Sequence, residues 1–233
     1  MSLFFIVSCK KKTESFVVDM GYDYAPTTIG KYVVYDIDSV VYDDFKKDTT
    51  FFKYRIKEKL EEIYIDNEGR SAIKLVRYIK KYDASVSYED MSWIVKDIWN
   101  YTKTKTTLEV VEENVRYTKL IFPINGGAEW NGNAFNTIGE WNYKYEYVDV
   151  AQKINATNFS NVLSVIQKND KNNVIHREFY NEKYAKNVGL VYREIKDLYS
   201  NKVTVLNGAI VPVEKRTEKG VIYKLVYVSH GNE

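Results

Sequence analysis

Apolar and polar positions alternate through most of the chain from about residue 30 onward. The clearest case is the stretch from Phe51 to Tyr64, where Tyr54 and Ile56 alternate with Arg55 and Lys57. Successive side chains of a β-strand point to opposite faces of a sheet, so this two-residue period indicates half-buried strands. The pattern predicts strands over residues 31–42, 51–64, 73–82, 93–104, 106–111, 115–122, 141–150, 174–180, 189–198, 202–213 and 221–228.

Two stretches depart from this simple alternation. Residues 158–166 match both a helical face and a strand, and we favour a strand because the turn-forming sequence at 169–173 follows. Residues 180–186 are compatible with one or two helical turns. No repeat period and no Ser- or Pro-rich linker divides the chain. The expected fold is therefore all-β, or β with one or two short helices: a single curled antiparallel sheet forming a half-barrel or open barrel.

Composition narrows the function classes. The chain has 34 basic and 32 acidic residues, and because they are interspersed we expect no nucleic-acid partner. The 21 Tyr outnumber the 10 Phe, which favours strands with partly solvent-exposed faces. With one Cys and two His, neither a thiolate nor a histidine metal site is expected, and we expect no cofactor.

The single cysteine follows a short apolar run from Leu3 to Val7 and precedes three lysines. The order Ile6-Val7-Ser8-Cys9 resembles the lipobox of Gram-negative envelope lipoproteins. That resemblance implies a diacylglyceryl group on the Cys9 thiol and removal of the preceding signal peptide. Lys10 in place of Asp implies outer-membrane sorting by the same resemblance, and we expect the protein to face the periplasm. The alternative is that residues 3–7 form a buried strand in which Cys9 is a small core residue.

This reading divides the chain into three parts. Residues 1–9 would be a signal-peptide remnant with the lipobox, residues 10–29 a tether, and residues 30–233 a single β-rich domain. The apolar run is too short to span a membrane, so attachment would be through acyl chains alone. A curled sheet of this kind is similar in architecture to the half-barrels of lipoprotein carriers.

Aromatic residues supply the candidate ligand site. Trp141, Tyr143, Tyr145 and Tyr147 occupy successive positions on one face of a predicted strand. They either cover the core side of the sheet or form a stacking wall for a lipid tail or sugar ring. Trp130 lies in a Gly-rich loop over residues 124–140, where it caps the sheet or reaches a ligand.

Catalytic groups are sparse. His176 lies beside Arg177 and Glu178 on a predicted strand and is best explained as a polar surface residue. The adjacent pairs Glu61-Glu62 and Glu112-Glu113 point to opposite faces of their strands, and an enzyme would need Asp36, Asp38 or Glu129 brought together by the fold. The sequence Asp48-Thr49-Thr50 is similar to a short O-glycosylation acceptor, with Thr49 the more accessible site.

Three hypotheses follow. The first is a non-catalytic, outer-membrane-anchored lipoprotein that binds a hydrophobic or amphipathic envelope ligand. The second is a protein or glycan interaction module of the cell envelope, and the third is an enzyme. A carrier needs a cavity of several hundred Å³, whereas an interaction module has a packed interior, so the size of the interior separates the first two.

Overall fold

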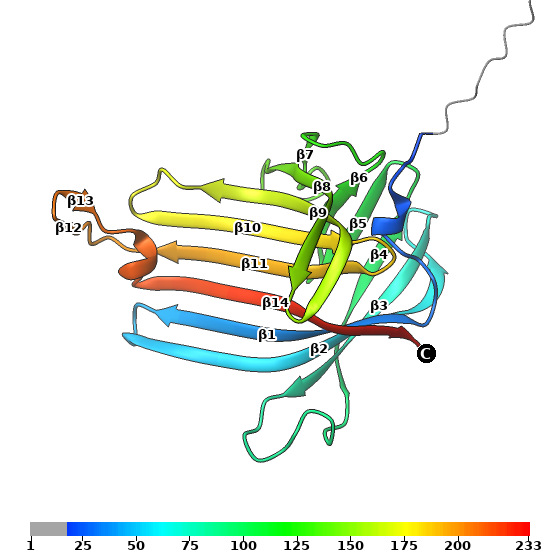
Figure 1. The fold of residues 1–233 in the computed structure, drawn as a ribbon, viewed down its shortest axis with the longest axis horizontal. Helices are drawn as coiled ribbons and strands as arrows, with labels where there is room; N and C mark the ends of the chain where they lie inside the picture. The colour runs from blue at the N-terminus through cyan, green and yellow to red at the C-terminus, as the bar shows by residue number, and fades with distance from the viewer. Residues whose placement is uncertain (1–17) are drawn as a thin grey trace, which may run out of the picture.

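A computed structural model describes residues 18–233, which form one large antiparallel sheet (Figure 1). The sheet has 12 strands in the order β6-β5-β4-β3-β2-β1-β14-β11-β10-β9-β8-β7, and it is nearly closed, barrel-shaped with an unsealed seam. Its strands are β1 (Lys31–Asp43), β2 (Asp48–Ile65), β3 (Ser71–Lys81), β4 (Ile94–Lys103), β5 (Thr107–Glu112), β6 (Val115–Ile121), β7 (Glu129–Asn131), β8 (Asn142–Ile154), β9 (Thr157–Asp170), β10 (His176–Ala185), β11 (Gly189–Tyr199) and β14 (Lys219–Asn232).

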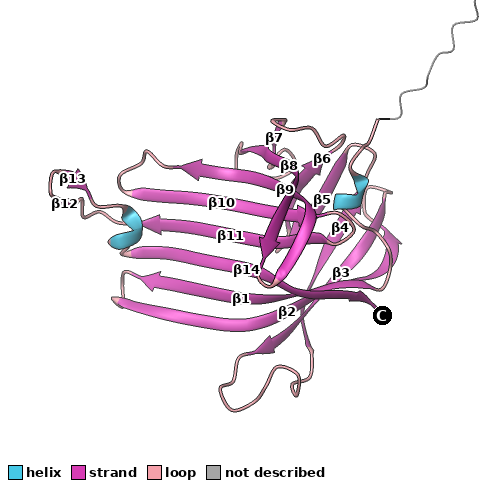
Figure 2. Ribbon diagram, in the orientation of Figure 1, coloured by secondary structure: helices cyan, strands magenta, loops and turns pink. Residues whose placement is uncertain are grey.

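The predicted all-β class and the curled antiparallel sheet are confirmed. Beyond the large sheet, the described residues form only a two-stranded hairpin and two 3-10 turns (Figure 2). The hairpin pairs β12 (Val205–Leu206) with β13 (Ala209–Ile210), and the turns are η1 (Tyr22–Tyr24) and η2 (Val213–Lys215). The ambiguous stretch at 158–166 is strand, as favoured, and lies within β9.

Three local predictions are wrong. Residues 129–131, within the loop predicted over residues 124–140, form the short strand β7, which pairs with β8 and places Trp130 opposite Tyr143. Residues 180–186 are not helical, because β10 continues to Ala185 and pairs with β9 on one side and β11 on the other. Residues 202–213 are not one strand, and they hold only the short hairpin and the start of η2. Val203 and Val205 alternate with polar residues in sequence but remain exposed.

The seam between β6 and β7 is joined largely by side chains. The Thr118 N–H donates to Gly132 O at 2.9 Å, and the Trp130 Nε1–H donates to Thr118 O at 2.8 Å. The Tyr145 hydroxyl donates to Ile121 O and accepts from the Ile121 N–H, both at 2.8 Å. These contacts satisfy polar groups of the β6 edge that a neighbouring strand would otherwise pair.

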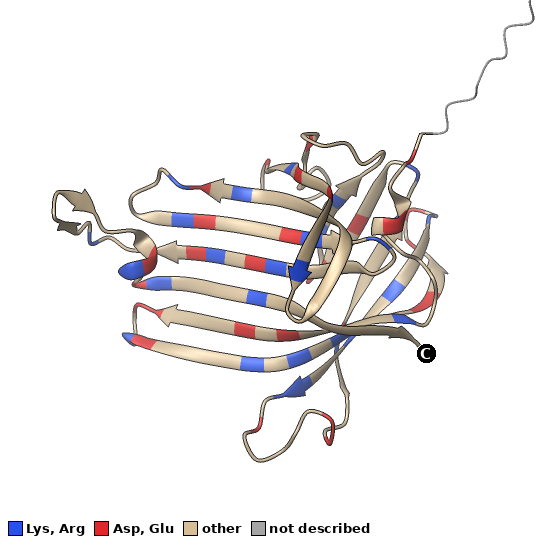
Figure 3. Cartoon of the chain, viewed as in Figure 1, with Lys and Arg blue, Asp and Glu red and all other residues tan. Residues whose placement is uncertain are grey.

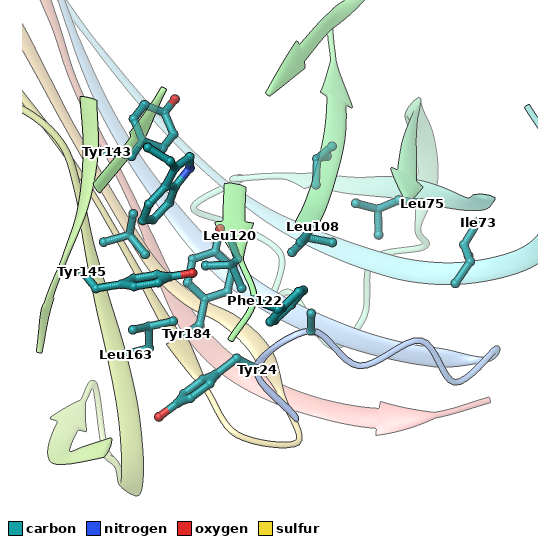
Figure 4. Packing of buried hydrophobic residues seen from close by; sticks show 14 of the residues in the cluster. Tyr24, Ile73, Leu75, Leu108, Leu120, Phe122, Tyr143, Tyr145, Leu163 and Tyr184 are labelled. Atoms are coloured by element: carbon teal, nitrogen blue, oxygen red, sulfur yellow. The ribbon is translucent and has the colours of Figure 1, made fainter. Parts of the chain in front are cut away.

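One end of the sheet, which we call the closed half, holds a hydrophobic core to which strands β2 to β10 contribute buried side chains (Figure 4). Leu120, Leu163 and Tyr145 are fully buried there. Tyr24 and Ala25, from the segment predicted as a tether, are also buried in this core. The division into signal remnant, tether and domain stays a prediction, because most of its first two parts lies outside the described residues.

At the other end, the ends of β1, β2, β9, β10, β11 and β14 project beyond the closed half and form what we call the open half (Figure 1). Strand β3 pairs with β2 only from Tyr54 onward, and β8 pairs with β9 only as far as Ile166. The projecting ends comprise residues 38–43, 48–53, 167–170, 176–180, 195–199 and 219–224. Basic and acidic residues are interspersed along these strands and along the rest of the sheet (Figure 3).

Candidate functional site

A row of half-buried side chains crosses the inner face of the open half. Strand pairing places Phe52, Ser39, Tyr223, Ile195 and Tyr180 opposite one another in this order, from β2 to β10. Residues opposite one another in a ladder share a face of the sheet. The next row on the same face is buried, and it includes Ile37, Leu225 and Arg193.

This row leads into a groove of about 310 Å³ between the sheet and the ends of β4 and β6. Tyr54, Tyr223 and Ile195 form the sheet wall, while Tyr117 and Val115 come from β6. We call this site the tyrosine groove. Its remaining lining residues are Arg77, Lys96, Trp99, Glu112, Glu113 and Arg193.

The first charged cluster of the tyrosine groove is built around Arg77. Its guanidinium stacks on the Trp99 ring at 3.7 Å from the ring centroid. It also contacts Glu58 at 3.0 Å and Asp97 at 3.1 Å. Arg77 is 5% exposed, and its carboxylate partners satisfy a charge that would be costly to bury alone.

The second cluster lies beside it and joins β11, β5, β10 and β6. Arg193 contacts Glu112 at 2.7 Å and Glu182 at 2.8 Å, and Lys119 contacts the same two carboxylates at 2.8 and 3.0 Å. Burial by itself would raise the pKa of Glu112, but the charges of Arg193 and Lys119 lower it to about 2. Burial also acts to raise the pKa of Glu182, but the charges of Lys119 and Arg193 lower it, so both carboxylates are ionised at neutral pH.

The tyrosines of the groove keep their protons at neutral pH. Burial raises the pKa of Tyr223, of Tyr54 and of Tyr117 above the usual value for a phenol. Each hydroxyl can therefore donate as well as accept a hydrogen bond, while the ring offers an apolar face. Such a wall suits a ligand that has both polar and apolar surface.

The interior of the closed half holds little free space. Between the second charged cluster and the N-terminal segment, side chains leave about 70 Å³. Leu75, Leu108, Tyr184 and Tyr24 are among the residues that line it. This volume suits a few water molecules, whereas sites for larger organic ligands occupy several hundred Å³.

The predicted aromatic ladder divides among different environments. Tyr143 and Tyr145 are buried in the core of the closed half, as is Trp130, while Tyr147 is 52% exposed. The register of β8 against β9 shifts between Tyr145 and Tyr147, so the side chains of these two residues lie in different environments. Trp141 is half-buried against Tyr180, with ring centroids 4.9 Å apart, and so borders the row that leads to the tyrosine groove.

The remaining sequence candidates lie apart from the groove or outside the described residues. Cys9 falls outside residues 18–233. Thr49 lies in the exposed start of β2, where its N–H bonds to the Asp48 carboxylate at 2.7 Å. His176 contacts Asp197 at 2.7 Å through Nε2. Within the described part of the chain, no group of His, Cys, Asp and Glu is arranged to hold a metal ion.

Sequence reasoning missed the groove, although its clusters leave a signal. Arg193 stands between Val191 and Ile195 on the apolar face of its strand, and Arg77 stands between Leu75 and Ile79. A charged residue at a position that alternation assigns to the interior marks a buried ion pair or a site. The carboxylates that contact Arg77 and Arg193 come from distant strands, so the sequence alone did not predict them.

Comparisons with known proteins add distant likenesses. No family model and no curated protein matches the chain. A candidate exported protein with a YmcC-like fold from Bacteroides fragilis is 10% identical over 89% of this chain and 98% of its own, with a TM-score of 0.41. A DUF1329 family protein from Desulfovibrio piger is 9% identical over 91% and 92%, with a TM-score of 0.23. At TM-scores below 0.5, neither likeness carries an argument about this chain.

The described residues also contain no helix that is long and apolar enough to cross a membrane.

Proposed function

We propose that this chain is a non-catalytic lipoprotein of a Gram-negative cell envelope, anchored in the outer membrane through Cys9. Its body binds an amphipathic ligand in the tyrosine groove. The observation that carries the ligand proposal is the groove itself, where three tyrosines stand beside ion pairs in an opening of about 310 Å³. Sites of this size and mixed chemistry are typical of small-molecule binding.

The groove is a better ligand site than the barrel interior. The interior space of about 70 Å³ is too small for an acyl chain, and core residues such as Leu108 and Tyr184 would have to move to enlarge it. Transport of a lipid inside the barrel is therefore disfavoured. Binding outside the core requires no such rearrangement.

A non-catalytic role is supported by the pairing of the charged groups. Arg77, Arg193, Lys119 and their carboxylate partners are locked in ion pairs. The His176 ring contacts Asp197, and the His230 ring contacts the Tyr227 hydroxyl at 2.8 Å. Neither histidine is among the residues that line the tyrosine groove, so neither would act there as a general base.

The ligand proposal is tested with dodecyl maltoside, kept below its micelle concentration, as an amphipathic probe. The full chain carrying Cys9→Ser is titrated and followed by NMR. We expect saturable binding that Tyr223→Ala weakens, because the substitution removes one wall of the groove. Tyr147→Ala is the matched control, since Tyr147 is a tyrosine exposed outside the groove. If Tyr223→Ala and Tyr147→Ala bind the probe equally well, the groove is not the binding site and the interaction-module alternative is favoured.

The anchor proposal has a separate test. Cys9→Ser, expressed with a complete signal peptide, should move the protein from the detergent phase to the aqueous phase, because no thiol remains to carry the acyl group. Unchanged partitioning would contradict lipidation at Cys9.

A further inference from the structure

The inference rests on the proposed function, because it concerns the ligand of the tyrosine groove. We infer that this ligand is a neutral carbohydrate, held by ring stacking against the tyrosines and by hydrogen bonds to its hydroxyl groups. Three features of the groove lead to this class of ligand: its balanced charges, its unpartnered donors and its facing aromatic walls.

The charges that line the groove are already balanced. Arg77 contacts Glu58 and Asp97, Arg193 contacts Glu112 and Glu182, and Lys96 contacts Asp97. An anionic ligand would have to compete with these carboxylates for each cation and would bring a further negative charge close to them. The groove therefore disfavours a phosphate, a carboxylate or an acidic sugar.

Two buried donors lack an acceptor. The Nε1–H of Trp99 and the Nε–H of Arg193 have no hydrogen-bond partner among residues 18–233, and both residues line the groove. Trp99 is 7% exposed and Arg193 is 9% exposed, so an unmet N–H in either is costly. Both nitrogens are covered by neighbouring side chains, so a sugar hydroxyl or ether oxygen reaches them only when those side chains shift, and it then supplies an acceptor without adding charge. An acyl chain would leave both donors unmet.

The aromatic walls supply the apolar contact. Tyr117 comes from β6, and Tyr54 and Tyr223 come from the sheet wall. The Trp99 ring is already contacted by guanidinium groups, 3.7 Å from its centroid for Arg77 and 6.0 Å for Arg193, and Lys119 lies 4.8 Å over the Tyr117 ring. The rings of Tyr54 and Tyr223 therefore offer the main stacking surface. A pyranose ring has an apolar C–H face and a rim of hydroxyls, and this combination matches tyrosine rings beside unmet donors.

The experiment uses the full Cys9→Ser chain and three kinds of probe. The neutral probes are maltotetraose, cellotetraose and chitotetraose, the anionic probe is tetragalacturonate, and the apolar probe is laurate. Binding is followed by NMR, with the Trp99 indole N–H signal assigned through Trp99→Phe. We expect at least one neutral tetrasaccharide to shift that signal saturably below about 10 mM, and tetragalacturonate to bind more weakly.

Three variants sharpen the expected result. Tyr223→Ala should weaken binding of the neutral sugar about tenfold, because stacking on one aromatic ring is lost. Tyr223→Phe keeps the ring and should bind within about threefold of the parent. Tyr147→Ala, outside the groove, should leave the affinity unchanged.

The contrary outcomes separate this inference from the proposed function. Laurate binding that Tyr223→Ala weakens, with no response to the neutral sugars, overturns the carbohydrate inference and leaves the groove as a ligand site. Tighter binding of tetragalacturonate overturns the requirement for a neutral ligand. If no probe binds and dodecyl maltoside also fails, the inference and the proposed ligand function both fall.

Discussion

The closed and open halves of the sheet share several strands but place their tyrosines in different environments. In the closed half, the hydroxyls of Tyr145 and Tyr35 bond to backbone groups, of Ile121 and Leu190 respectively. In the open half, the Tyr180 hydroxyl bonds to the Asp197 carboxylate at 3.1 Å. The comparison shows that strands covered on the inner face use tyrosine as a core residue, whereas uncovered strands keep it as an amphipathic surface.

This difference depends on whether other strands cover the inner face of the sheet, and not on the local sequence. Tyr145 and Tyr223 both lie in alternating strands, yet Tyr145 is fully buried because β6 and β7 meet above it. Tyr223 remains half-buried beside a groove because the facing strands end nearby. Closure of the sheet therefore decides which tyrosines can meet a ligand.

The largest effect should come from breaking the buried ion pairs of the second charged cluster. Glu182→Ala removes a carboxylate shared by Arg193 and Lys119 and leaves two buried cations with a single partner, Glu112. We expect the free energy of unfolding to fall by about 3–5 kcal/mol. Urea denaturation measures it, and a loss under 1 kcal/mol would show that water reaches the cluster.

Acid should weaken the same cluster. The pKa of Glu112 in the folded protein is about 2, below its ordinary value of 4.5, so the stabilisation is complete above pH 4.5 and is lost as the pH falls towards 2. The contribution is on the order of 3 kcal/mol. Denaturation between about pH 5 and pH 2 should show this loss, and in Glu112→Gln the decline should be shallower.

A smaller effect is expected at the seam. Tyr145→Phe removes the hydroxyl that bonds both Ile121 N–H and Ile121 O, and should cost about 1–3 kcal/mol. Hydrogen exchange at the Ile121 amide should accelerate. Tyr147→Phe is the matched control, because Tyr147 is exposed and outside the seam, and it should leave both quantities unchanged. Equal losses in the two variants would mean that the seam does not depend on this hydroxyl.

The smallest effect should come from a surface pair of the open half. Asp38 and Lys53 are 3.8 Å apart and both are more than half exposed. Asp38→Ala should change the free energy of unfolding by no more than about 0.5 kcal/mol, since exposed pairs are screened by solvent. A loss comparable to that of Glu182→Ala would remove the distinction between the two halves.

The alternation of apolar and polar residues was sufficient to predict most strands and the antiparallel class, because a two-residue period can be read within each strand. It was insufficient at residues 202–213, where Val203 and Val205 alternate with polar residues but lie exposed outside the large sheet. For the site, the sequence identified Trp141, at the border of the aromatic row, but not Tyr223 or Arg193. Those residues come together through the pairing of β14 with β11, which no local pattern encodes.

The seam between β6 and β7 also affects how this sheet can evolve. Ladder hydrogen bonds belong to the backbone and survive almost any substitution other than proline, so strand order is robust to mutation. The junction between β6 and β7 instead depends on the indole of Trp130 and the phenol of Tyr145. Single codon changes can therefore loosen or tighten the closure while the strand order is preserved, which makes the degree of closure an evolvable property of this architecture.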